Sequence, residues 1–123
     1  MKTKKIVFPE VNRAALVDGD PQVAGADYVI VKTAVSTVSA GTERANITGD
    51  ANVSGRNAPS VKFPRSAGYS SAGTVVEVGP AVTSVKAGDR VIVFWGSHSS
   101  YNVVPERKVL KIEDENISFA QAA

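Results

Sequence analysis

The stretch from Gly68 to Val91, GYSSAGTVVEVGPAVTSVKAGDRV, constrains the fold of this chain more than any other. Its four glycines, at positions 68, 73, 79 and 88, fall where an extended chain starts, bends or turns. Between the second and the third, every residue of Thr74–Val78 except Glu77 is β-branched, which favours a strand. We predict a strand, a Gly79-Pro80 turn, a short loop and a Gly88-Asp89 turn into the next strand.

Length and charge narrow the class of protein. A chain of 123 residues with 43% hydrophobic content can bury one core and not two, so we expect a single domain. The formal net charge of +2 is too small to indicate a nucleic-acid partner, because phosphate binding requires a concentrated basic face. Cysteine is absent, which excludes disulfides, Cys-ligated zinc and a cysteine nucleophile within this sequence.

The start of the chain lacks the pattern of a secretory signal. The basic residues up to Lys5 are followed by an apolar segment, Ile6–Phe8, that stops at Pro9 and is too short for a signal-peptide core. No apolar run reaches the length of a membrane span. We therefore expect a cytoplasmic protein without a membrane partner.

Further strands are predicted on both sides of the glycine-rich stretch. Tyr28–Val38 is dense in Val, Ile and Thr and predicts a long, partly bent strand at the centre of a barrel. Arg90–Trp95 is a continuous apolar run, which indicates a strand that is covered on both faces or packed at a domain junction. The remaining strand predictions are a hairpin of Lys4–Phe8 and Arg13–Val17, then Tyr101–Pro105 and Val109–Ile112.

Two helices and one long loop complete the expected elements. The segment after Ser39 predicts about two turns of helix, with a cap near Thr42 and an end at Gly49. Asp50–Arg65 has no periodicity and predicts a long surface loop of the kind that covers or lines sites. Ser118–Gln121 fits a capping box, so a helix begins there. Because so short a helix is unstable by itself, we expect a longer protein.

Three motifs carry a resemblance to a known superfamily. They are Gly68-Tyr69-Ser70-Ser71-Ala72-Gly73, Val75-Val76-Glu77-Val78-Gly79 and Gly88-Asp89-Arg90-Val91. Their order resembles the GroES-like catalytic domain of the medium-chain dehydrogenase/reductase superfamily, which includes the zinc alcohol dehydrogenases and the zinc-free quinone reductases. The resemblance implies a mainly β fold with short helices, a GroES-like partly open β-barrel, over residues 1–123. It also implies a Rossmann nucleotide-binding domain that follows, because no Gly-x-Gly-x-x-Gly fingerprint occurs in this sequence.

The zinc ligands of that superfamily are replaced in this chain. A Cys precedes a Thr/Ser-Asp segment in the zinc enzymes, and here Ala40 stands before Gly41-Thr42-Glu43. The His of the Gly-His-Glu motif is matched by Tyr69, and Ser70 follows it. Alanine cannot bind a metal, and Tyr and Ser hydroxyls are poor zinc ligands. The resemblance therefore implies a member without zinc.

Two hydroxyl groups are the candidate catalytic groups. Thr42 matches the position where the superfamily has a proton-relay Ser or Thr, and Tyr69 matches a lost metal ligand. Either could donate a proton or a hydrogen bond to the atom that changes charge during hydride transfer. We expect Ala40, Thr42 and Tyr69 to line a common hollow. The alternatives are that Tyr69 only fills the volume of the lost metal site and that Thr42 only caps the helix.

Four other side chains are weighed for a role. Arg44 and Glu43 are candidate cofactor-binding residues. Arg44 could reach a phosphate, or Glu43 could orient Arg44. The favoured alternative is that both side chains lie on a solvated face of the helix and bind nothing. His98 lies in a Gly- and Ser-rich turn and is predicted to be an exposed loop residue rather than a catalytic base. Trp95, with its neighbour Phe94, is predicted to pack in the core or against another domain rather than to form a substrate platform.

The sequence thus predicts the N-terminal substrate and catalytic domain of a zinc-independent, NAD(P)-dependent oxidoreductase of the alcohol dehydrogenase and quinone reductase type, inactive as an isolated piece. Its implied partners are a small-molecule substrate and its own C-terminal Rossmann domain. One alternative is a GroES-like binding or scaffold module, and another is a pseudoenzyme without redox activity. The substrate, the choice of NAD or NADP and the oligomeric state, a homodimer included, stay open.

Overall fold

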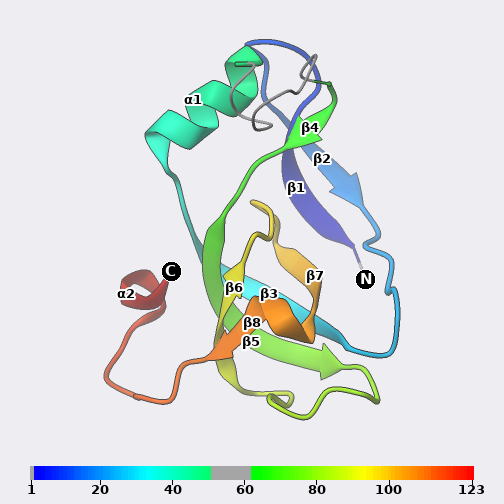
Figure 1. Cartoon of the computed structure of the whole chain (residues 1–123), viewed down its shortest axis with the longest axis vertical. Coiled ribbons are helices and arrows are strands. Elements are labelled where there is room, and N and C mark those ends of the chain that lie inside the picture. The colour runs from blue at the N-terminus through cyan, green and yellow to red at the C-terminus, as the bar shows by residue number, and fades with distance from the viewer. Residues whose placement is uncertain (1, 51–61) are drawn as a thin grey trace.

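The computed structural model describes residues 2–50 and 62–123 (Figure 1). Within them, the chain forms eight strands and two α-helices. The strands are β1 (Thr3–Phe8), β2 (Ala15–Gly19), β3 (Tyr28–Thr37), β4 (Arg65–Ser66), β5 (Ser70–Val78), β6 (Arg90–Phe94), β7 (Tyr101–Pro105) and β8 (Val109–Lys111). The helices are α1 (Ala40–Thr48) and α2 (Phe119–Ala122), and a 3-10 turn, η2 (Glu106–Lys108), precedes β8.

The strands form two antiparallel sheets that curl toward each other. The larger sheet has five strands in the order β7-β3-β5-β6-β8, and the smaller has three in the order β2-β1-β4. An isolated antiparallel bridge between Lys5 and Ser99 joins them. This arrangement confirms the predicted fold class, a mainly β, partly open barrel with short helices.

The long strand β3 lies at the centre of the larger sheet, between β7 and β5. Its register with β5 shifts twice, between Ile30 and Val31 and again between Thr33 and Val35. Extra residues at such shifts bend a strand and increase its twist. The prediction of a long, bent, central strand is therefore confirmed, and the opening hairpin is also present, although β2 begins at Ala15, two residues later than predicted.

Gly73 shows why the glycine-rich stretch constrains the fold. It pairs with Thr33 of β3 on one side and with Val91 of β6 on the other. A Cβ at this position would lie 2.1 Å from the carbonyl oxygen of Lys32, inside the distance that any side chain tolerates. The close approach of β5 to the bent part of β3 therefore requires glycine. The predicted turns at Gly79-Pro80 and Gly88-Asp89 are present as well.

The core is a cluster of valines from the strands of the larger sheet. Val29, Val31, Val75, Val91 and Val93 are the largest fully buried side chains. In β6 buried and less buried residues alternate, and Phe94 on the less buried face is 42% exposed. Of the two interpretations of this run, a strand covered on both faces was therefore wrong, because an apolar run does not reveal which of its two faces is covered. Packing at a domain junction stays a prediction.

The two helices differ in how they begin. Helix α1 starts after Ser39 and ends at Gly49, whose φ of +73° is the left-handed conformation that favours glycine. The predicted end is confirmed, but the cap position is Ser39 and not Thr42. Helix α2 has the predicted capping box of Ser118 and Gln121, and the Arg90 guanidinium lies 4.6 Å from the centre of the Phe119 ring.

Most of the predicted long loop Asp50–Arg65 lies outside the described residues, and Arg65 itself belongs to β4. Among residues 2–50 and 62–123, none of the helices has the length and apolar character needed to pass through a bilayer.

Glu106 gives the fold a measurable response to acid. Its carboxylate accepts hydrogen bonds from the Ser84 hydroxyl at 2.7 Å and from the backbone N–H groups of Ser84 and Thr83, both at 2.8 Å. These bonds, the Ser84 hydroxyl first, lower the pKa of Glu106 below its ordinary value. They stabilise the fold above the carboxyl pKa of the unfolded chain, and the stabilisation is lost as pH falls through the lowered pKa of the folded state.

We predict that Glu106→Gln lowers the melting temperature at pH 7 and that the difference from the wild type shrinks as pH falls below about 4.3, the ordinary value for Glu. Thermal unfolding followed by circular dichroism from pH 7 to pH 3 measures this. Glu115→Gln is the matched control, because Glu115 is an exposed carboxylate outside the helices and strands. An equal difference at pH 7 and pH 3 would contradict the assignment.

Candidate functional site

The turn between β6 and β7, Trp95–Ser100, is the most unusual polar segment of the described chain. His98 is 8% exposed and Ser99 is 7% exposed, although both are polar. The prediction that His98 is an exposed loop residue was therefore wrong. Buried polar groups need hydrogen-bond partners, and the partners of this turn come from many other parts of the chain: β1, β3, α1, the segment before β5, β7 and η2.

Both ring nitrogens of His98 have a side-chain partner. Nε2 lies 2.6 Å from Glu43 Oε1 in the first turn of α1, and Nδ1 lies 2.8 Å from Ser36 Oγ on β3. The Glu43 side chain is only 19% exposed. The favoured alternative for Glu43, a solvated helix face, was therefore wrong, because its carboxylate is directed to His98.

The acceptor character of Glu43 settles the role of one imidazole nitrogen, Nε2. An ionised carboxylate can only accept, so His98 Nε2 carries a hydrogen and donates it to Glu43. The Ser36 hydroxyl can rotate, so it donates to a bare Nδ1 or accepts from a protonated one. Ser36 therefore satisfies His98 in either charge state, and the contact with Glu43 persists in both.

The segment before β5 lies against the same turn. The His98 N–H donates to the Ala67 carbonyl at 3.1 Å, and the Trp95 N–H donates to the Tyr69 carbonyl at 2.8 Å. Gly68, between these two acceptors, has a φ of +124°. A Cβ at Gly68 would lie 2.7 Å from the His98 nitrogen. Glycine is thus required here both by the backbone conformation and by the closeness of the turn.

Tyr69 and Trp95 form an exposed aromatic pair at adjoining ends of β5 and β6. Their ring centres are 5.9 Å apart at an angle of 61°, an edge-to-face contact. Tyr69 is 43% exposed and Trp95 is 68% exposed. The prediction that Trp95 packs in the core was therefore wrong; packing against another domain stays a prediction.

The backbone of Trp95 is held in a rare conformation. Its φ is +52°, where bulky residues are seldom found and where a cost of about 1–3 kcal/mol is typical. The Trp95 carbonyl accepts from Lys108 Nζ at 3.1 Å and its N–H is bonded to Tyr69, so both sides of the residue are held. Such strain on an exposed aromatic side chain is a reason to look for function at this position.

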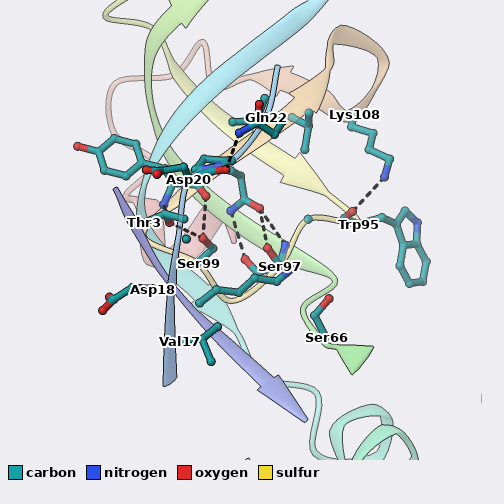
Figure 2. Close-up of a pocket in the computed structure, with 18 of the residues that line it drawn as sticks. Thr3, Val17, Asp18, Asp20, Gln22, Ser66, Trp95, Ser97, Ser99 and Lys108 are labelled. Carbon is teal, nitrogen blue, oxygen red and sulfur yellow. Dashed lines mark hydrogen bonds between the residues drawn. The ribbon is translucent and has the colours of Figure 1, made fainter. Parts of the chain in front are cut away.

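An open groove of about 410 Å³ runs along the other residues of the same turn (Figure 2). It lies between the end of β2 and β7, and Trp95, Ser97 and Ser99 border it, whereas His98, between the two serines, contacts α1. Asn102, 4% exposed, holds this turn: its side-chain oxygen accepts from the Ser97 N–H at 2.9 Å. The groove is therefore bordered by one side of a turn whose His98 contacts α1.

The predicted site residues do not all meet. Thr42 is exposed on α1, and its hydroxyl oxygen accepts from Ser39 Oγ at 3.2 Å. Neither Thr42, Tyr69 nor Ala40 lines the 410 Å³ groove, so the expectation of a common hollow finds no support there. Arg44 is exposed and borders a separate hollow of about 390 Å³ beside α1. Over residues 2–50 and 62–123 there is no group of three or more His, Cys, Asp or Glu side chains that could hold a metal ion.

The sequence analysis missed the contact between Glu43 and His98. The two residues are 55 positions apart, and no local spacing links a helix start to a turn between strands. The signal that was present is compositional: the turn SHSS lies between two apolar strands, and short connections between buried strands have little room for exposed side chains. The strain at Trp95 has no sequence signal, because left-handed residues are usually Gly, Asn or Asp.

Taken together, a partly open antiparallel barrel, a short helix after its long bent strand and glycine-dependent turns define the chain as a GroES-like domain. Its sequence matches the alcohol dehydrogenase GroES-like domain family over residues 25–114. The match covers more than half of the chain, so the chain belongs to this family.

Two curated proteins are similar to part of the chain. The NADPH-dependent alkenal/one oxidoreductase, chloroplastic, of Arabidopsis thaliana is 41% identical in an alignment of length 72 that covers 50% of this chain and 18% of that protein. The alcohol dehydrogenase class-3 of Cereibacter sphaeroides is 57% identical over 37 residues, 30% of this chain and 10% of that protein. The similar regions thus span less than a fifth of either relative.

Solved structures share the fold along nearly the whole chain. A quinone oxidoreductase of Pseudomonas syringae pv. Tomato DC3000 is 30% identical with a TM-score of 0.74, covering 98% of this chain and 36% of that one. An alcohol dehydrogenase superfamily protein of Novosphingobium aromaticivorans is 26% identical with a TM-score of 0.81, and the match covers 98% of this chain and 37% of that one. This chain therefore corresponds to little more than a third of each of these proteins.

Substitution of Gly68 tests how tightly the segment before β5 is bound to the turn. We predict that Gly68→Ala lowers the free energy of unfolding by about 2 kcal/mol or more, because the new Cβ meets backbone atoms that cannot move independently. Urea unfolding of the protein measures this.

Gly41→Ala is the matched control. Gly41 lies in α1 with open space around it, so alanine should stabilise the protein by up to about 1 kcal/mol through helix propensity. Equal stability of the two variants would contradict the contact between Gly68 and the turn.

Proposed function

We propose that this chain is the N-terminal catalytic and substrate-binding domain of an NAD(P)-dependent oxidoreductase that reduces small conjugated carbonyl compounds or quinones. The observation that carries the proposal is the Tyr69–Trp95 pair, a partly exposed phenol beside an exposed, backbone-strained indole. Membership of the alcohol dehydrogenase GroES-like family supports the reaction class. The names of the 41% identical and 30% identical relatives, an alkenal/one oxidoreductase and a quinone oxidoreductase, support the substrate class.

The groups present fit one part of a dinucleotide cofactor. Arg44 is exposed and borders the hollow beside α1 together with Gly41 and Thr48. The Arg44 guanidinium suits a phosphate, which Arg binds with paired hydrogen bonds, and it would have to outweigh the Asp50 carboxylate that borders the same hollow. Glu43 does not share this role, because its carboxylate is occupied by His98. We assign Arg44 to cofactor binding and withdraw Glu43 from it.

A bound NAD(P)H supplies a hydride, and the reduced substrate takes up one proton besides. Tyr69 is suited to give that proton, because its phenol lies at an exposed position and its ring is oriented by Trp95. Tyr69 then regains a proton from water, so the domain is unchanged after a turnover. The flat indole face of Trp95 offers a planar substrate a stacking surface.

Thr42 has a supporting part in this proposal. Its hydroxyl accepts from Ser39, so its own hydrogen is free to be donated toward a substrate or cofactor oxygen. The zinc-independent character rests on Ala40 and Tyr69, which stand where the resembling zinc enzymes have ligands. The hydroxyl groups of Thr42 and Tyr69 are then the available proton donors at these positions.

The remaining parts of the proposal concern the whole protein. A Rossmann domain elsewhere in the protein binds most of the dinucleotide, because the sequence has no glycine-rich fingerprint of its own. The solved relatives, of which this chain covers 36% and 37%, are consistent with such a further domain. We place the protein in the cytoplasm. The scaffold and pseudoenzyme alternatives are the outcomes that absence of activity would favour.

Activity measurements on the full-length protein test the two hydroxyl roles. We predict that Tyr69→Phe lowers kcat for reduction of trans-2-hexenal or 1,4-benzoquinone by NADPH by about 10²- to 10⁴-fold, the usual contribution of a positioned proton donor. Thr42→Val should have a smaller effect in the same direction. Tyr28→Phe is the matched control, because the Tyr28 hydroxyl bonds Glu77 at 2.7 Å, away from this pair. Wild-type activity in both Tyr69→Phe and Thr42→Val would remove the roles proposed here.

The isolated 123-residue chain should bind NADPH weakly and show no turnover. Titration of the purified chain with NADPH, followed by cofactor fluorescence, measures binding, and loss of NADPH absorbance with either substrate measures turnover. Full-length protein assayed in parallel is the control. Turnover by the isolated chain would show that no further domain is needed.

A further inference from the structure

Helix α1 is held at its two ends by polar contacts. None of its apolar residues is buried, and its one buried side chain, Asn46, donates to the Thr42 carbonyl within the helix itself. At the C-terminal end the Ile47 carbonyl accepts from the Asn12 N–H at 2.8 Å. At the N-terminal end, Glu43 is bonded to His98 of the barrel at 2.6 Å. Besides the chain connection to β3, this side-chain pair thus positions the first turn of α1.

His98 is itself fixed to the barrel from three directions. Its N–H donates to the Ala67 carbonyl, its carbonyl accepts from the Ile6 N–H at 2.9 Å, and its Nδ1 is bonded to Ser36. The backbone of His98 cannot follow Glu43 if α1 moves, because its N–H and carbonyl are both paired, and the bond from Nδ1 to Ser36 restrains rotation of the imidazole. Helix α1 is consequently the element that adjusts, and His98 is the fixed point.

The set Ser36, His98 and Glu43 has the residue types of a hydrolase triad, but not its accessibility. His98 is 8% exposed, Ser36 is only partly exposed, and none of the three residues lines the 410 Å³ groove. A nucleophile must be reached by the bond that it attacks. The arrangement of the three residues is therefore better suited to fixing the position of α1 than to nucleophilic catalysis by Ser36.

We propose that Ser36, His98 and Glu43 are a positioning device that sets the first turn of α1, and with it Thr42, relative to the segment that carries Tyr69. Glu43 is the residue next to Thr42, and His98 is bonded to Ala67, two residues before Tyr69. One residue thus connects the two segments on which the proposed proton donors lie: the His98 imidazole bonds Glu43, and the His98 backbone N–H bonds Ala67. The expected effect on catalysis rests on the proposed function, whereas the expected effect on the position of α1 does not.

Three variants and one control distinguish loss of the contact between Glu43 and His98 from a general loss of stability. Glu43→Ala removes the carboxylate, and His98→Asn keeps a polar atom toward Ser36 but falls short of Glu43. His98→Gln extends an amide about as far as Nε2 and should restore the contact. Glu106→Gln is the matched control, because it removes carboxylate hydrogen bonds at η2 without touching α1.

Hydrogen exchange of the full-length protein is the structural measurement. We expect Glu43→Ala and His98→Asn to speed amide exchange at Glu43–Thr48 by about tenfold or more relative to the wild type, with β3 unchanged, because only the local opening of α1 becomes easier. His98→Gln should restore slow exchange. Unchanged exchange in α1 for both disrupting variants would overturn the device, whatever the activity of the protein.

Kinetics with 1,4-benzoquinone and NADPH measure the catalytic consequence. We expect kcat to fall about 10- to 100-fold in Glu43→Ala and His98→Asn with KM changed far less, and more than in Glu106→Gln at equal loss of melting temperature. Suppose that Glu43→Ala and His98→Asn exchange faster in α1 but keep the wild-type kcat, and that Thr42→Val or Tyr69→Phe is impaired. That outcome would overturn the positioning role for catalysis and leave the proposed function standing. If Thr42→Val and Tyr69→Phe are also fully active, the proposed function fails, and the exchange data still decide whether the device exists.

Discussion

The hydrogen bonding of one buried polar turn governs how the two sheets and the helix fit together. Residues 97–100 lie where the small sheet, the large sheet and α1 meet, and their polar groups are paired with each of them. The Ile6 N–H reaches the His98 carbonyl, and the Thr33 N–H reaches the Ser100 carbonyl at 3.0 Å. Leaving one such buried group unpaired costs about 1–3 kcal/mol. Any rearrangement that breaks several of these bonds together is therefore strongly disfavoured, and the elements around the turn keep one arrangement.

The fold was predictable from sequence because its determinants are local. The valine-rich segments and the glycine turns mark strand ends within a few residues, and the structure has strands where each segment predicted one. Gly73 illustrates the agreement: a glycine just before the β-branched run Thr74–Val78 predicted a start, bend or turn of the chain, and in the structure the Lys32 carbonyl of the bent strand β3 lies in the space of its missing side chain. Burial was less predictable. The run that became β6 reads as uniformly apolar, but its exposed face depends on where the sheet ends, which the run itself does not encode.

The candidate site was predictable only in part, because its contacts are distant in sequence. Tyr69 was found from a motif, and the structure adds Trp95 beside it with an exposed indole. His98 was read as exposed because a lone histidine among Gly and Ser usually is. Its burial results from Ser36, Glu43 and Ala67, which come from three segments with no spacing rule in common. A polar turn too short to leave the barrel surface was the one sequence signal, and it indicates burial without identifying the partners.

The polar anchoring of α1 has a physical consequence that apolar anchoring would not. Apolar packing is non-directional, so a helix on an apolar surface can shift while keeping most of its contact area. A charge-assisted hydrogen bond weakens steeply with distance and angle. Burying its groups recovers little net stability, so the gain from Glu43 and His98 is mainly definition of position. A helix that carries a hydroxyl for proton transfer benefits from that definition, since a displacement of about 1 Å is enough to impair a reaction.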